Sequence, residues 1–134
     1  MNGLPMPPDD PRNRPHWEAA MNGKLLIQRC TACGHCRFPA TRECERCHHF
    51  ESEWIEASGL GEIESFCIFH KTYWPAFREA LPYTVIQVRL QEGMRLMSNF
   101  VAPDSRPPSI GMPVRARFDA VSPELTLVRF APLA

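Results

Sequence analysis

Residues 30–47 read CTACGHCRFPATRECERC. Two Cys-x-x-Cys pairs stand on either side of a ten-residue spacer, which is the spacing of a zinc ribbon. Each pair can form a tight turn in which two thiolates converge on one cation. Gly34 follows the first pair, where such a turn needs a positive φ, and His48, at the equivalent place, is among the residues that tolerate it. We therefore predict one structural zinc ion held by four thiolates: Cys30, Cys33, Cys44 and Cys47.

The cysteines could also fill a core, form a redox-active pair or form two disulfides. Four regularly paired cysteines within eighteen residues are too dense for chance filling of a core. A redox-active Cys-x-x-Cys would sit within a βαβ pattern, which the sequence does not show. Two disulfides would imply secretion, and the first residues lack the layout of a secretory signal. Metal ligation is thus the favoured interpretation.

Length and charge limit the class of protein. The chain has 134 residues, which suits one average domain or two very small ones that share an interface. Its 15 basic and 15 acidic residues balance, which counts against a generic electrostatic nucleic-acid binder. No apolar run approaches the roughly 18–20 residues needed to cross a bilayer. We expect a cytoplasmic protein in a thiol-reducing compartment, with no membrane association.

The first part of the chain predicts an arm, a helix and the ribbon. Residues 1–15 contain five prolines and form an extended arm, either disordered or lying along a partner. Residues 16–23 predict a short helix with Trp17, Ala20 and Met21 on one face. Strands are expected at 24–29 and 53–57, and Ser58-Gly59 marks a boundary. The predicted domains are therefore the arm (1–15), the helix and ribbon (16–57) and a second domain (58–134).

The second domain has a β pattern. Residues 84–91 alternate cleanly between apolar and polar side chains, and turn residues bound the other segments. Five strands, the first of them long and bent, fit a small closed barrel of the OB-fold type. The fold class is therefore mainly β: a short helix and a rubredoxin-like zinc ribbon followed by a five-stranded OB-fold barrel. The expected strands are 61–71, 84–91, 94–101, 113–121 and 125–130.

A loop rich in aromatic residues, TYWPAFREALP, occupies residues 72–82. Its rings could plug the end of the barrel as a lid, or they could line a groove for a ligand or a partner. The preceding strand carries Cys67, which we interpret as a small thiol buried in the core. It ends near His70, a lone histidine that is more often a surface residue than a general base.

With these elements identified, the chain resembles a known family. The stretch HWEAAMNGKLLIQRCTACGHCRFPATRECERC is similar to the opening of the DUF35 family of acyl-CoA-associated zinc-ribbon and OB-fold proteins. SGLGEIESF, PYTV, EGMRLMSN and IGMPV resemble later family segments, so the likeness covers about residues 16–121. Two features depart from the family pattern: Glu45 and His48 replace a usual Pro and Gly, and Cys36 is an extra thiol. Further conceivable ligands are Cys36, His35, His48 and His49, but four regular cysteines already complete a tetrahedron.

The resemblance implies a small non-catalytic subunit that binds acyl-CoA or scaffolds a thiolase-superfamily enzyme, such as a thiolase, acyltransferase or aldolase. It implies a hetero-oligomer with that enzyme, and acyl-CoA or coenzyme A as a ligand. Aromatic rings could cover a pantetheine arm or a partner surface, and two basic side chains could meet the phosphates of CoA. The candidate ligand-binding residues are Phe69, Lys71, Tyr73, Trp74, Phe77 and Arg78.

Two other functions remain open. Zinc ribbons and OB-folds both occur in single-stranded nucleic-acid-binding modules, but the middle strands offer few outward rings and there is no net positive charge. A free-standing enzyme would need a catalytic set, and no Ser-His-Asp set, Gly-rich phosphate loop or metalloprotease pattern occurs. We expect an accessory subunit with no catalytic residues of its own.

Overall fold

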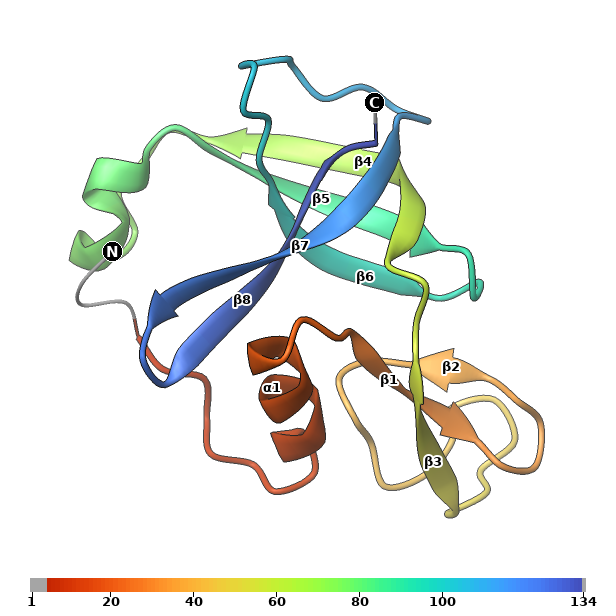
Figure 1. The fold of residues 1–134 in the computed structure, drawn as a ribbon. Coiled ribbons are helices and arrows are strands. Elements are labelled where there is room, and N and C mark those ends of the chain that lie inside the picture. The colour runs from red at the N-terminus through yellow and green to blue at the C-terminus, as the bar shows by residue number, and fades with distance from the viewer. Residues whose placement is uncertain (1–4, 134) are drawn as a thin grey trace.

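The protein is described by a computed structural model that covers residues 5–133. A three-stranded sheet with the order β2-β1-β3 precedes a closed barrel with the order β4-β5-β6-β8-β7 (Figure 1). The predicted ribbon and five-stranded barrel are both confirmed, whereas residues 1–4 of the predicted arm lie outside the described residues. The elements are α1 (Arg14–Met21), β1 (Leu26–Cys30), β2 (Cys36–Arg37), β3 (Ser52–Glu56), β4 (Leu60–Phe69), the 3₁₀ helix η1 (Pro75–Ala80), β5 (Tyr83–Leu90), β6 (Arg95–Phe100), β7 (Pro113–Ser122) and β8 (Leu125–Pro132).

Helix α1 buries Ala20 and half-buries Trp17, as predicted, but it also buries His16 and leaves Met21 exposed. His16 and Ala20 are the buried residues of α1, while Met21 is 52% exposed. The His16 ring stacks on Phe38 with centroids 4.0 Å apart, and its Nδ1 lies 3.1 Å from the carbonyl oxygen of Leu26. A carbonyl can only accept, so Nδ1 carries the proton and donates. Burial of the histidine is possible because its polar atom finds a partner that periodicity alone does not reveal.

The ribbon sheet is centred on β1, which pairs antiparallel with both β2 and β3. Gln28 on β1 is buried, and its amide is fully engaged: Nε2 donates to Thr41 O at 3.1 Å and to Ser52 Oγ at 2.8 Å, and Oε1 accepts from Thr41 N at 2.9 Å. Burial of the amide therefore leaves no unpaired polar group there. The loop between the two cysteine pairs is held against the sheet by these bonds.

The barrel core continues into the ribbon. Phe130, Ile63 and Ile86 are fully buried in the barrel, and the same hydrophobic cluster contains Leu25 and Ile27 from the ribbon side. Helix α1 contacts β1, β7 and β8, so it bridges the two parts. Figure 1 shows α1 lying between the ribbon sheet and the β7–β8 hairpin.

The prediction for Cys67 is wrong: its thiol is exposed. A bulge between Ile63 and Ser65 shifts the β4–β5 register by one residue. A shift of one residue moves every following side chain to the opposite face of a strand. Phe66 therefore pairs with the buried Ile86, and Cys67 pairs with Val85 on the outer face.

Across residues 5–133, no helix combines the length and the apolar character that a membrane span requires.

Burial of His16 predicts a pH dependence of stability. Burial lowers the pKa of His16 from its ordinary 6.5, and the hydrogen bond to Leu26 only partly opposes this. The unfolded chain therefore takes up the proton first as pH falls, and the free energy of unfolding decreases below about pH 6.5. In His16→Asn, whose amide can still donate to Leu26, we expect urea midpoints to fall less between about pH 7.5 and 5.5. An equal fall in both proteins would contradict this role of His16.

Candidate functional site

The four cysteines of the two pairs converge on one point. Their Sγ atoms all lie within 4.8 Å of one another, with Cys30–Cys47 at 3.5 Å and Cys33–Cys44 at 3.6 Å. Four sulfurs about 2.3 Å from a central zinc in tetrahedral geometry would lie roughly 3.8 Å apart. The observed separations fit one zinc ion. The structure therefore brings together all four residues that the spacing indicated.

The two turns that carry these cysteines have matching backbones. Gly34 N donates to Cys30 O at 3.0 Å, and His48 N donates to Cys44 O at 2.8 Å. Gly34 and His48 have φ values of 78° and 66°, as the sequence predicted for this place in each turn. The backbone N–H of Arg46 lies 3.4 Å from the Cys44 sulfur. The main chain thus shapes both turns and directs donors at the thiolates.

The thiols do not titrate alike. Backbone N–H groups, chiefly that of Cys33, hold the pKa of Cys30 at about 6. Burial opposes ionisation of Cys44, but the backbone N–H groups of Cys47 and Arg46 outweigh it and lower that pKa. The N–H of His49 favours a Cys47 thiolate, yet burial and the other three thiols raise its pKa to about 12. Four thiolates this close cannot all ionise without a cation, which is the charge that a divalent metal supplies.

Three of the four alternative ligands, namely His35, His48 and Cys36, are engaged elsewhere. His35 Nε2 lies 2.8 Å from a carboxylate oxygen of Glu45, and His48 Nδ1 lies 2.8 Å from one of Glu43. Cys36 packs against the hydrophobic core instead of joining the cluster. Within residues 5–133, the four-cysteine group is the one cluster of three or more such side chains with a metal-binding arrangement. A site with four protein thiolates has no open coordination position, so a metal there orders the chain and does not activate water.

The aromatic loop forms a second site on the barrel. Phe69 stacks on Tyr83 with centroids 5.1 Å apart and meets Tyr73 edge-on at 6.0 Å. Phe77 meets Tyr83 at 5.9 Å, so four rings form a row from the end of β4 to η1. Lys71 places its Nζ 5.3 Å from the centre of the Tyr73 ring. Lysine and rings are therefore joined in one cluster.

Two other candidate ligand-binding residues lie outside this row. Trp74 is 61% exposed and has no ring contact with another described residue. Arg78 is exposed on η1. The structure thus brings together Phe69, Lys71, Tyr73 and Phe77, but does not add Trp74 or Arg78 to that cluster.

A cavity of about 450 Å³ lies between η1 and the outer face of the barrel. It is lined by Phe77 and by residues that sequence reasoning missed, among them Tyr83, Asn99 and Arg129. These come from β5, β6 and β8, far apart in the sequence. The one sequence feature that pointed to this cavity is the outward position of Arg129 on its strand. That position does not reveal which residues the side chain faces.

Comparison with known proteins identifies the class. The model of the ChsH2 rubredoxin-like zinc ribbon domain matches residues 17–53, and that of the ChsH2 C-terminal OB-fold domain matches residues 54–119. The chain belongs to this family of zinc-ribbon and OB-fold proteins, the DUF35 family.

Individual relatives carry several names. A protein of Thermomonospora curvata named probable enoyl-CoA hydratase alpha subunit is 42% identical over 124 residues, and the match spans 90% of this chain but 38% of that protein. A DUF35 domain-containing scaffold protein of Methanocaldococcus jannaschii is 33% identical over 97 residues, covering 70% of this chain and 67% of that one. A solved structure titled Ltp2-ChsH2(DUF35) aldolase matches with a TM-score of 0.82 and 40% identity, covering 96% of this chain and all of that chain.

If zinc orders the ribbon, two cysteine variants should differ sharply in zinc content and in folding. Cys44→Ser replaces a buried thiol of the cluster, and we expect loss of bound zinc and unfolding of the ribbon, since structural zinc contributes about 10–16 kcal/mol in small zinc domains. Cys36→Ser changes a thiol outside the cluster and should keep one zinc per chain. Elemental analysis and hydrogen exchange of residues 26–56 measure both effects. Stable, folded Cys44→Ser protein without zinc would show that the metal does not hold the ribbon.

Proposed function

We propose that this chain is a non-catalytic subunit that scaffolds a thiolase-superfamily enzyme acting on acyl-CoA thioesters. The closed thiolate site supports a structural role for zinc. The structural match at 40% identity is to a chain titled as part of an aldolase, and a relative at 33% identity is named a scaffold protein. A related chain of Thermomonospora curvata is named as a hydratase subunit. Two of these names refer to an enzyme, an aldolase and a hydratase, and the third refers to a scaffold protein.

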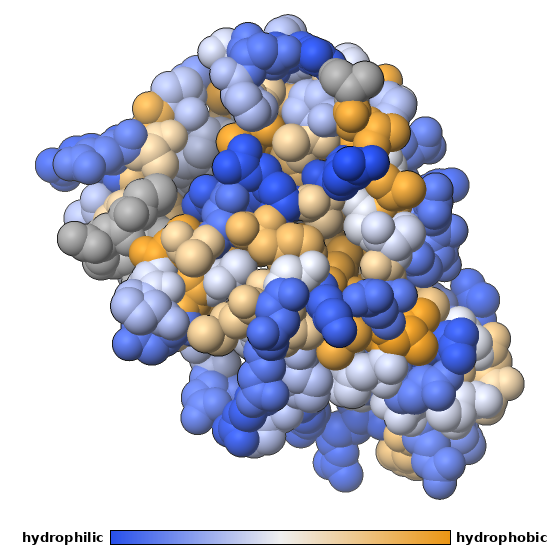
Figure 2. All heavy atoms as spheres, viewed as in Figure 1, coloured by the Kyte–Doolittle hydropathy of each residue, from blue (hydrophilic) through white to orange (hydrophobic). Residues whose placement is uncertain are grey.

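Exposed apolar side chains around the end of β4 carry this proposal. Phe66 and Ile68 are 38% and 46% exposed, and Tyr73 and Trp74 in the following loop are 63% and 61% exposed. Beyond Glu62, β4 has no further pairing with β7, so one edge of its second half faces away from the barrel ladder. Exposed apolar groups beside an open strand edge are typical of a surface that another protein covers. On the face drawn in Figure 2, other hydrophobic residues are divided into separate patches by hydrophilic ones.

The same loop is the proposed place for coenzyme A. Its rings offer apolar surface to a pantetheine arm. Lys71 beside the Tyr73 ring and the exposed Arg78 on η1 are the cations proposed to meet the phosphates. The groups proposed to contact the ligand are Phe69, Lys71, Tyr73, Trp74, Phe77 and Arg78. The partner enzyme would contact the remainder of the coenzyme A molecule.

A single-stranded nucleic-acid-binding module is less well supported by the charges. Arg89 and Arg95 lie side by side on β5 and β6, but Glu64 pairs with both, at 2.7 and 3.0 Å. The hydrogen bond from Arg89 lowers the pKa of the Glu64 carboxyl most. Burial opposes this, but Arg95 lowers the pKa further, and the net shift is downward. A carboxylate among the arginines would repel a phosphate backbone.

Removal of the two exposed rings should weaken the complex. We expect Tyr73→Ala/Trp74→Ala to bind the partner enzyme at least about tenfold more weakly, because exposed aromatics are frequent anchors of interfaces. Met97→Ala removes a 69% exposed side chain on β6 and is the matched control. The partner would be co-purified from the native host, identified by mass spectrometry, and titrated against each variant. No thiolase-like partner, or equal weakening by the control, would argue against the proposed scaffold surface.

Ligand titrations separate the two binding classes. We expect a CoA thioester to bind the complex and Lys71→Gln to weaken that binding several-fold, since a cation at a phosphate contributes a charge-assisted hydrogen bond. Lys24, the other lysine of the chain, is exposed near the ribbon, and Lys24→Gln is the charge-matched control. Binding of a single-stranded oligonucleotide with no binding of CoA would reverse the order of the two hypotheses.

A further inference from the structure

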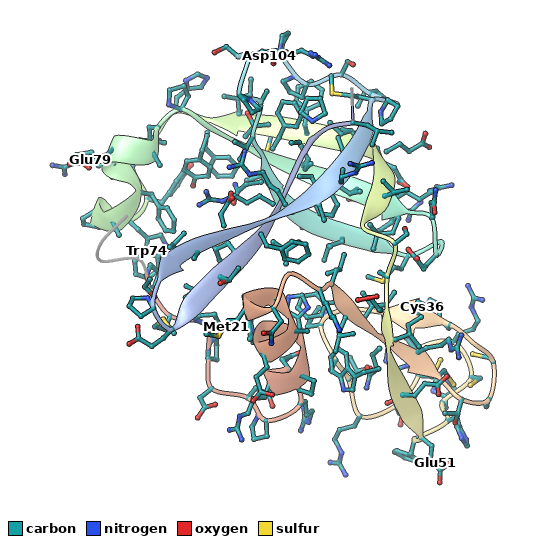
Figure 3. The ribbon with its side chains drawn as sticks, in the orientation of Figure 1. Met21, Cys36, Glu51, Trp74, Glu79 and Asp104 are labelled. Atoms are coloured by element: carbon teal, nitrogen blue, oxygen red, sulfur yellow. The ribbon has the colours of Figure 1, made fainter. Side chains whose placement is uncertain are left out.

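The cavity beneath η1, called the η1 groove below, has apolar walls and an ordered frame. Phe77 from η1 lines a volume of about 450 Å³ together with Tyr83, Val85 and Leu127 of the barrel. Tyr83 is held in place by its stacking on Phe69, with ring planes 9° apart. Figure 3 shows that Glu79, on the far side of η1, points away from the barrel. The volume is within the usual range for small-molecule pockets.

One charged side chain lines this apolar groove. Arg129 comes from β8, and its side chain is 21% exposed. Its Nη1 lies 3.4 Å from Asp119 Oδ2, at the limit of a hydrogen bond, and its Nε is buried without a partner in the described structure. A guanidinium donor left unpaired in a low-dielectric setting costs free energy unless an acceptor meets it.

The neighbouring charges leave a positive surplus beside the groove. Arg117 is the direct cross-strand neighbour of Arg129, and it takes the other oxygen of Asp119 at 2.9 Å. One carboxylate therefore serves two guanidinium groups. Asn99 also lines the groove, and its Nδ2 donates to Thr84 O at 3.2 Å, which leaves its Oδ1 as an additional polar atom. The groove thus offers apolar walls and one incompletely neutralised cation.

We propose that the η1 groove binds a small aliphatic carboxylate, with the alkyl chain between Phe77 and Leu127 and the carboxylate on Arg129. A planar carboxylate accepts two parallel N–H groups from a guanidinium, which an alcohol or an amide cannot do as well. The alkyl chain buries apolar area against these walls, which favours binding. This site needs no nucleotide, and Lys71 does not line it. It shares Phe77 with the proposed coenzyme A site, so Arg129 and Lys71 are the residues that distinguish the two.

Octanoate is the probe, used with the full chain and followed by calorimetry and by Tyr83 chemical shifts. We expect octanoate to bind and 1-octanol to bind at least about tenfold more weakly, because the alcohol cannot form the charge-assisted hydrogen bonds of a carboxylate. Octanoyl-CoA separates a free carboxylate from a thioester as the source of the acyl group. Binding of octanoyl-CoA alone would overturn the assignment, as would equal affinities for octanoate and octanol.

Two arginine variants test the site itself. Arg129→Gln should weaken octanoate at least about tenfold, whereas Arg117→Gln removes the same charge from the same carboxylate without lining the groove and should have little effect. Equal losses in both variants would show a diffuse charge effect and overturn the site. Ala80 lines the groove from η1, and Ala80→Trp should fill it and abolish binding in protein whose circular dichroism is unchanged. Unchanged octanoate affinity in Ala80→Trp would also overturn the proposal, even where Arg129→Gln fails to fold.

Discussion

A single hydrophobic core that runs from the ribbon into the barrel is the constraint on which this small structure depends. The backbone of β1 belongs to the ribbon sheet, yet Leu25 and Ile27 are buried in the same cluster as Val88 and Phe130 of the barrel. Burying an aliphatic side chain of this size contributes about 1.5–3 kcal/mol. A ribbon of about 40 residues is too small to build a sufficient core by itself. Metal, helix and barrel must therefore act together.

This arrangement separates the element that orders the chain from the surfaces that can bind. The cysteine turns fix the far end of the ribbon, where a closed thiolate site has no chemistry to offer a substrate. The aromatic row and the η1 groove lie on the barrel. In Figure 3, Cys36 on strand β2 of the zinc ribbon and Trp74 beside η1 are on opposite sides of the molecule. A partner could cover the aromatic loop without contacting the metal site. The zinc would still order the ribbon, whose residues pack on α1 and on the barrel.

Paired charges also shape what the barrel can recognise. The outward-facing positions of its strands carry several arginines. Glu64 pairs with two of them, and Asp119 pairs with two others. Both carboxylates are largely buried, at 20% and 18% side-chain exposure, so these pairs are only partly screened by solvent. In each group one carboxylate serves two guanidinium groups, so one positive charge remains without its own carboxylate. Arg129 is such a cation, and it lies beside apolar walls.

Local sequence determined the features that depend on short separations. The cysteine spacing specified four converging sulfurs, Gly34 and His48 adopted the expected positive φ, and alternation in residues 84–91 gave the inward face of β5. Only the tertiary structure decided the rest. The bulge after Ile63 places Cys67 on the exposed face of β4. The Leu26 carbonyl accepts a hydrogen bond from His16, which allows that residue of α1 to be buried. The η1 groove brings together Phe77, Asn99 and Arg129. Each of these depends on a partner that is distant in sequence, and periodicity carries no information about such a partner.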